Sequence, residues 1–126
     1  MIDFSITGTT AAVNAFNRVN EKQDRNVRRV VREFSLYTRD LTRFFCPVGS
    51  GFMQRKVKTE LLDDGYAFET GWNAEDFFNA NRSFYPPFVE FGTSKVPARP
   101  SLGRAMEIAG PEFTEAIATA VATAAV

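Results

Sequence analysis

Five carboxylates have a spacing or a setting that could support acid–base chemistry. Asp63 and Asp64 are adjacent, as are Glu75 and Asp76, and Glu90 stands alone among apolar residues. General acid–base catalysis needs a carboxylate with a tuned pKa beside a second positioned group. Adjacent carboxylates in turns are typically solvated, and no second catalytic group accompanies Glu90. The sequence therefore predicts that these residues are structural and that the protein is not an enzyme.

Other groups that commonly carry chemistry are scarce. The chain has no histidine and a single cysteine, Cys46. This excludes Ser-His-Asp and Cys-His systems, histidine metal sites, thiolate clusters and an intrachain disulfide. The glycine-containing segments 7–10 and 49–51 lack the Lys-Ser/Thr of a phosphate-binding loop. We expect no cofactor and no metal, and we expect Cys46 to be a small buried apolar side chain.

Glu90 needs a partner if it is buried, because an unpaired buried carboxylate costs several kcal/mol. It lies in the segment FVEF at 88–91, and Arg99 follows nine residues later. Arg99, or an arginine from the basic segment 18–43, could provide the opposite charge. We therefore expect Glu90 to form a structural ion pair with an arginine.

Positive charge is concentrated in one segment of a neutral chain. The 15 cations balance the 15 anions, yet residues 18–43 contain eight cations and four anions. A basic segment and an acidic remainder favour head-to-tail contact between copies. A solvated helix face with helical ion pairs would explain the same pattern without a partner. Four arginines could face DNA or a neighbouring copy: Arg25, Arg28, Arg29 and Arg32.

These charges lie on a predicted long helix. Residues 9–45 contain neither Gly nor Pro, a threonine at 9 or 10 can cap the start, and Pro47 supplies the stop. A helix of about 35 residues would be about 50 Å long, so part of it should contact a partner. Asn20 and Gln23 interrupt its apolar stripe, which indicates a kink near Asn20 or docking on two surfaces. The stripe residues expected to face the core are Val27, Val30, Phe34, Tyr37, Leu41 and Phe44.

Alternating segments predict a small antiparallel sheet. Residues 2–7 alternate apolar and polar side chains and predict a strand that ends at Gly8. Alternation over 53–61 and 66–72 flanks Asp63–Gly65, and an Asp-Gly turn between two such runs is typical of a β-hairpin. We expect the hairpin face with Tyr66, Phe68 and Trp72 to pack against the long helix.

The remaining segments predict loops and helices. Residues 73–83 should be a loop or a hairpin tip, and 86–91 a short turn or helix that Gly92 ends with a positive φ. Two prolines should stiffen 93–100 into an arm that loses little entropy on docking. Ser101–Ala109 and 112–125 should be helices that Gly110–Pro111 separates. The expected fold is one α+β domain over residues 1–126, with a long N-terminal helix on a small antiparallel β-sheet and a C-terminal helix.

The segment YPPFVEFGTSKVPARPSL, residues 85–102, resembles a known family signature. The signature is Tyr-Ala-x-x-Val-Glu-Phe-Gly-Thr … Pro-Ala-x-Pro-Phe-Leu of the small neck, or tail-completion, proteins that join head and tail in long-tailed bacteriophages. FFCPVGSGFMQRKVKTEL, residues 44–61, resembles the family's Ala-Pro-Val-x-Thr-Gly-x-Leu-Arg-x-Ser-Ile segment. GRAMEIAGPEF, residues 103–113, resembles its Arg-Pro-Ala start of the last helix. The chain departs from the family at Ser50, Pro86, Ser101 and Gly103, where the family has Thr, Ala, Phe and Pro.

The resemblance implies a structural virion protein that assembles as a ring at the phage neck or the top of the tail. The ring, hexameric or dodecameric, would join the head-completion complex to the tail tube or tail terminator around the DNA channel. The implied location is the virion, with host cytoplasm during assembly and no membrane partner. The motif residues implied at the contact between copies are Tyr85, Phe88, Glu90, Phe91, Gly92, Thr93, Pro97, Arg99 and Pro100.

A different class of function is a small nucleic-acid-binding regulator that uses the face from Arg25 to Arg32. The net charge of this chain is zero, which is atypical of a general nucleic-acid binder. Rings or tubes of the isolated protein would favour the neck hypothesis. A stable monomer with salt-sensitive DNA affinity would favour the regulator.

Overall fold

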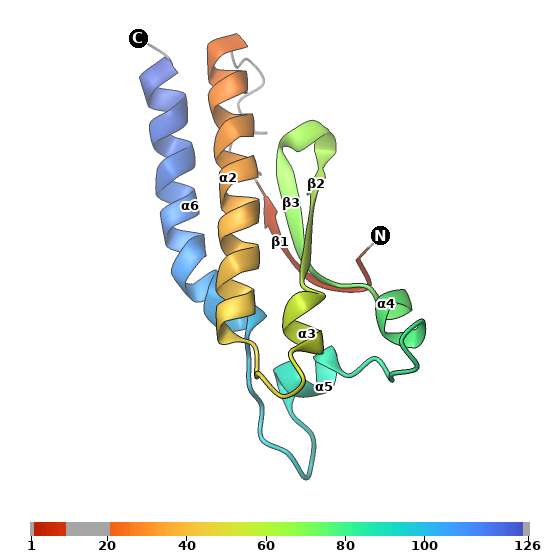
Figure 1. Ribbon diagram of the computed structural model, residues 1–126. Coiled ribbons are helices and arrows are strands. Elements are labelled where there is room, and N and C mark those ends of the chain that lie inside the picture. Colours follow the sequence, from red (N-terminus) through yellow and green to blue (C-terminus); the bar gives the residue numbers. More distant parts are fainter. Residues whose placement is uncertain (1, 10–20, 125–126) are drawn as a thin grey trace.

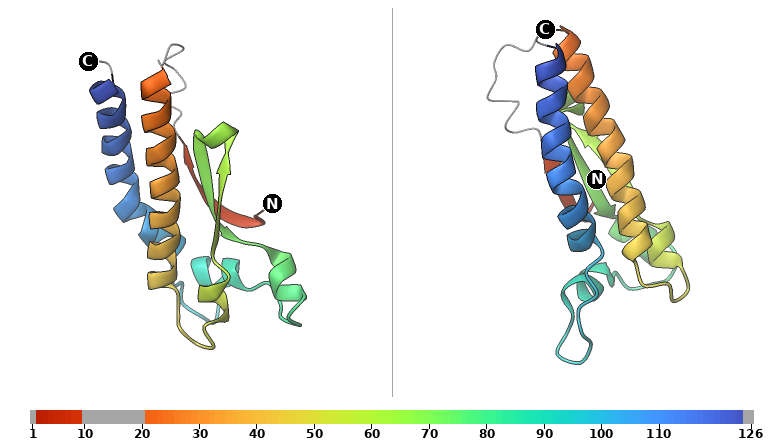
Figure 2. Two further views of the ribbon diagram at one scale, coloured as in Figure 1. Left: turned by 45° about the horizontal axis from the view of Figure 1, so that its top comes forward. Right: turned by 90° about the vertical axis from the view of Figure 1, so that its left-hand side faces the viewer.

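Two long helices and a small sheet make up the computed structural model, which describes residues 2–9 and 21–124. The helices α2 (Glu21–Phe45) and α6 (Leu102–Ala124) run antiparallel, and α2 lies between α6 and the β-hairpin (Figures 1 and 2). The predicted α+β architecture is confirmed. The expected helix start and the expected kink near Asn20 lie outside the described residues.

The sheet is antiparallel, with strand order β1-β3-β2. The predicted hairpin is confirmed, because β2 (Lys58–Leu62) and β3 (Ala67–Trp72) flank a short 3-10 turn at Asp63–Gly65. The start of its first strand, predicted within the run 53–61, is wrong, because residues 52–55 are helical. β1 is Phe4–Thr9, so the prediction that the first strand ends at Gly8 is wrong. Gly8 pairs with Phe68 within the β1–β3 ladder, because central strand β3 offers partners along its whole length.

The upper core lies between α2, α6 and the sheet. Its buried members include Val27, Val31, Phe68 and Phe113, which confirms that Phe68 faces the long helix. Gln23 is also buried, and its Nε2 donates to the Val121 carbonyl oxygen at 3.1 Å. A polar residue is tolerated in the apolar stripe there because its amide has a hydrogen-bond partner on α6.

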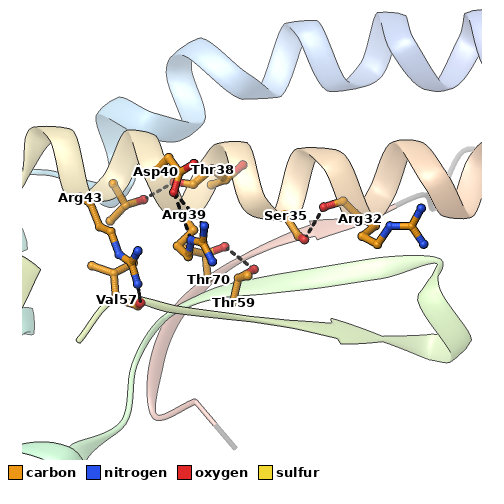
Figure 3. Close-up of polar contacts among 10 residues, drawn as sticks. Arg32, Ser35, Thr38, Arg39, Asp40, Arg43, Val57, Thr59 and Thr70 are labelled. Carbon is orange, nitrogen blue, oxygen red and sulfur yellow. Dashed lines mark hydrogen bonds and ion pairs between the residues drawn. The ribbon is translucent and has the colours of Figure 1, made fainter. Parts of the chain in front are cut away.

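The lower half of α2 differs from the predicted stripe. Phe44 is 76% exposed and Tyr37 is also exposed, so the prediction that they face the core is wrong. Small hydroxyl side chains are buried instead, at Ser35, Thr38 and Thr42, and Figure 3 shows Ser35 on the side of α2 that faces the sheet. Two of these hydroxyls donate within the helix, Ser35 to the Arg32 carbonyl at 2.6 Å and Thr42 to the Thr38 carbonyl at 2.7 Å. In this half of the helix, small side chains are therefore buried where Tyr37 and Phe44 are exposed.

A second core lies below the sheet. Trp72, Phe77, Phe52 and Leu102 are buried there with Cys46. The Trp72 indole N–H donates to the Met53 carbonyl at 2.9 Å, so Trp72 belongs to this cluster and not, as predicted, to the face on the long helix.

Two short helices contribute buried side chains to this second core. They are α3 (Phe52–Arg55) and α4 (Ala74–Phe78). The prediction of a loop or hairpin tip at 73–83 is wrong, because a helical turn there brings Phe77 into the core. The Phe77 ring meets the rings of Phe52 and Tyr85 edge-on, with centroids 5.0 and 5.1 Å apart.

Helix α6 continues through Pro111, so the predicted break at Gly110–Pro111 is wrong. Pro111 is exposed, whereas Ala109 and Phe113 on either side are buried. A proline inside a helix costs about 3 kcal/mol, and packing on both sides offsets that cost. Within the described ranges, no helix is long and apolar enough to cross a membrane.

Candidate interaction surfaces: the arm and the charged helix faces

The first surface is built on a short helix that ends in a left-handed glycine. Helix α5 (Pro86–Phe91) starts with two prolines and ends at Gly92, whose φ is 77°, so both predictions for this segment are confirmed. A Cβ on Gly92 would lie 2.7 Å from the Ala98 backbone nitrogen. Only glycine therefore allows the chain to turn and pass this close to its returning strand.

Glu90 is buried, at 6% exposure, but its partner is not an arginine. Its Oε1 accepts the backbone N–H groups of Ser101 and Leu102, both at 3.0 Å, and its Oε2 accepts that of Gly103 at 3.0 Å. These are the unpaired N–H groups at the start of α6, where the helix dipole also favours negative charge. The expected ion pair is thus replaced by a carboxylate cap, since a helix N-terminus satisfies both carboxylate oxygens at once.

Residues 92–100 form a closed arm whose two ends are held together. The backbone N–H of Arg99 donates to the Val89 carbonyl at 2.7 Å, and that of Gly92 donates to the Phe88 carbonyl at 2.8 Å. At the tip, the Thr93 N–H donates to the Val96 carbonyl at 2.8 Å, and Thr93 Oγ1 accepts the Val96 N–H at 3.0 Å. The arm is preformed by its own backbone and projects from the body of the molecule (Figure 1).

The arm and its base expose apolar side chains. Phe91 is 74% exposed, and Phe88 and Val96 are exposed too. Phe91 still has a ring contact within the subunit, edge-on to Phe4 with centroids 5.7 Å apart. Tyr85 packs on Phe77 in the second core.

The predicted motif residues therefore divide into two groups. Tyr85, Glu90, Gly92 and Thr93 shape the subunit. The residues with exposed side chains are Phe88, Phe91, Pro97 and Arg99, together with Thr93 itself, and Pro100 is half-buried.

The second surface is the basic face of α2. Its four predicted arginines line one surface hollow together with Asn26. Arg28 is engaged: it pairs with Asp24 at 3.1 Å, and its guanidinium lies 4.8 Å from the centre of the Tyr66 ring. Arg29 pairs with Glu33 at 3.8 Å. Arg25 and Arg32 have no side-chain partner among the described residues, so they are the two arginines best placed to meet another molecule.

The positive charge continues along α2 on the side of the hairpin. Figure 3 shows Arg39 and Arg43 directed to this side, away from α6. The Arg43 Nη2 donates to the Val57 carbonyl at 3.0 Å, and Arg39 pairs with Asp40 at 3.1 Å. Arg43 thus ties α2 to the residue that directly precedes β2.

A third surface, on the outward side of α2 and α6, was not predicted. Exposed Phe44, Tyr37 and Ile108 lie there with the exposed acidic residues Glu112 and Glu115, which follow Ile108 by one and two turns on the same side of α6. Partial desolvation, and then the charge and hydrogen bond of Glu112, raise the pKa of Tyr37, which shows that α2 and α6 share this face. In the sequence, Tyr37 and Phe44 belong to the apolar stripe of α2, and apolar periodicity alone places that stripe in the core.

Cys46 is buried, and this burial raises the pKa of its thiol to about 11, although a side-chain hydrogen bond with Ser101 acts in the opposite direction. The expectation of a small buried side chain is confirmed. At neutral pH the thiol stays protonated and is a poor nucleophile.

In the part of the chain that the structure describes, no group of three or more Asp, Glu, His or Cys side chains is arranged to bind a metal ion. Comparison of this chain with protein-family models, with curated proteins and with solved structures gives no match. Arguments about function therefore start from the arm, the basic face of α2 and the apolar–acidic face of α2 and α6.

Proposed function

We propose that this protein is a structural subunit of a tailed-phage virion. In this proposal it assembles as a ring at the neck or the top of the tail and joins the head-completion complex to the tail tube around the DNA channel. The observation that carries the proposal is the preformed arm 92–100, which presents exposed side chains on a base that Glu90 holds. It occupies the segment whose sequence resembles the neck-protein signature.

A preformed arm suits an assembly protein for a thermodynamic reason. A loop that is already ordered loses little conformational entropy when it docks. Exposed aromatic side chains, such as Phe88 and Phe91, then contribute apolar contact area. The arm can therefore bind a neighbouring subunit without folding at the same time.

The charge distribution also supports contact between copies. Arginines follow α2 on its hairpin side, whereas the described part of α6 has one cation, Arg104, and three anions, Glu107, Glu112 and Glu115. Unlike charges on two different surfaces of one chain suit a head-to-tail contact, which closes into a ring when the rotation between copies permits. A hexamer or a dodecamer would satisfy this condition, and Arg25 and Arg32 would be available to DNA in the channel.

The oligomeric state of the purified protein tests the proposal. Light scattering and negative-stain images over a range of protein concentrations should show rings or short tubes. Virions assembled without the protein should contain separate filled heads and tails. A protein that stays monomeric at every concentration, and virions that join normally without it, would contradict the proposal.

A nucleic-acid-binding regulator is the second candidate, and the unpaired state of Arg25 and Arg32 among the described residues favours it. Binding to a DNA duplex, followed by fluorescence anisotropy at several salt concentrations, tests this candidate. If each arginine neutralises a phosphate, then Arg25→Ala and Arg32→Ala should each reduce the salt slope by about one. Wild-type affinity that is independent of salt would exclude it.

A further inference from the structure

We propose that the arm of one copy docks on the outward face of α2 and α6 of the next copy, over Tyr37, Phe44 and Ile108 and beside Glu112 and Glu115. This inference rests on the proposed association of copies. It assigns the two surfaces that meet in that association.

The receiving face is apolar at its centre. Phe44, Tyr37 and Ile108 are large side chains that remain exposed on the two packed helices. The antiparallel pairing of α2 and α6, with Gln23 next to Val121 at one end, brings the C-terminal part of α2 beside the N-terminal part of α6. Exposed apolar side chains that gather on one face mark a contact site.

The arm has the matching apolar and charged groups. Segment 91–100 carries exposed Phe91 and Val96, two cations, Lys95 and Arg99, and no anion. The receiving helix α6 has an excess of negative charge, and its one described cation is Arg104. The opposite signs favour the encounter and fix its orientation. Because both complementary surfaces belong to the same chain, a second copy is the partner that fits.

The arm does not cover the receiving face of its own subunit. Glu90 ties the arm's base to the start of α6, and the arm extends away from both helices (Figures 1 and 2). A folded-back loop of nine residues reaches roughly 13 Å. It is therefore long enough to lie across a helix of a neighbouring copy, whose diameter is roughly 10 Å. The contact is therefore heterologous: each copy gives its arm to one neighbour and receives an arm from the other.

Charge reversal on either surface tests this docking. The arm variant carries Lys95→Glu with Arg99→Glu, and the face variant carries Glu112→Lys with Glu115→Lys. Two exposed ion pairs would be lost in each case, so each variant alone should self-associate about tenfold more weakly. A one-to-one mixture should recover the wild-type affinity, because the reversed arm of one protein then meets the reversed face of the other. A control with Glu21→Lys and Glu75→Lys, both exposed and outside the proposed contact, should associate like wild type.

Cysteine crosslinking provides a second readout that does not depend on charge. Val96→Cys and Ile108→Cys proteins should form a mixed disulfide dimer when combined, while buried Cys46 stays reduced in both. A Val96→Cys protein that crosslinks mainly to itself would show arm-to-arm contact and would overturn the docking. If rings form but neither the charge reversals nor the mixed disulfide has an effect, the docking is wrong and the ring stands. If no oligomer forms at any concentration, both proposals fail.

Discussion

Glu90 Oε1 accepts the backbone N–H of Leu102 at 3.0 Å, so a side chain of α5 caps the N-terminus of α6. The same carboxylate also accepts the N–H groups of Ser101 and Gly103. This one residue completes the start of a long helix and fixes the base of the exposed arm. Glu90 therefore affects both the stability of the subunit and the position of the arm, which is the proposed contact element.

Replacing Glu90 with Gln should destabilise the protein. The Gln amide keeps one acceptor oxygen but directs an NH₂ group at backbone N–H donors, which leaves buried donors unpaired. We expect the free energy of unfolding to fall by about 2–4 kcal/mol in urea titrations. The exposed Glu75→Gln is the matched control and should remain within about 0.5 kcal/mol of wild type. An unchanged urea midpoint for Glu90→Gln would refute the capping role.

Replacing Gly92 with Ala should disrupt the arm. The new Cβ would meet the Ala98 backbone nitrogen at 2.7 Å, at a positive φ that alanine rarely adopts. We expect a loss of about 1–3 kcal/mol in unfolding free energy, together with weaker self-association. Gly49→Ala serves as the control, because nothing lies within 4 Å of a Cβ there. Equal stability of the two variants would contradict the described geometry.

Phe44→Ser should leave the isolated subunit as stable as wild type, because Phe44 is largely exposed. We expect a change of less than about 0.5 kcal/mol in unfolding free energy, with a clear loss of self-association. Phe77→Ala, in contrast, removes a fully buried ring and should cost about 3–5 kcal/mol. A large loss of subunit stability in Phe44→Ser would show that the residue belongs to the core after all.

Ionisation of Cys46 should lower the free energy of unfolding at alkaline pH. Burial raises the pKa of its thiol to about 11 in the folded chain, above the ordinary value of a free thiol. A raised pKa means that the unfolded state loses its proton first, so the contribution is complete below about pH 9 and is lost as pH rises toward 11. Thermal unfolding of wild type and Cys46→Ala between pH 7 and pH 11 should therefore converge at high pH. Parallel curves would contradict the burial effect.

Local sequence features determined a large part of this fold. The Asp-Gly turn between two alternating runs predicted the hairpin, and Gly92 after an apolar turn predicted the left-handed end of α5. These features can be predicted because backbone preferences and alternation act over a few neighbouring residues.

Tertiary structure alone decided which surfaces meet. The partners of Glu90 are backbone N–H groups. Every residue except proline has such a group, so no pattern of side chains in the sequence identifies these partners. In the lower half of α2, Ser35, Thr38 and Thr42 are buried and Phe44 is exposed, although apolar periodicity favoured a buried Phe44. Pro111 stays inside α6 because Ala109 and Phe113 pack on both sides of it. In each case the deciding free energy comes from contacts between segments far apart in the chain, and it exceeds the local preference.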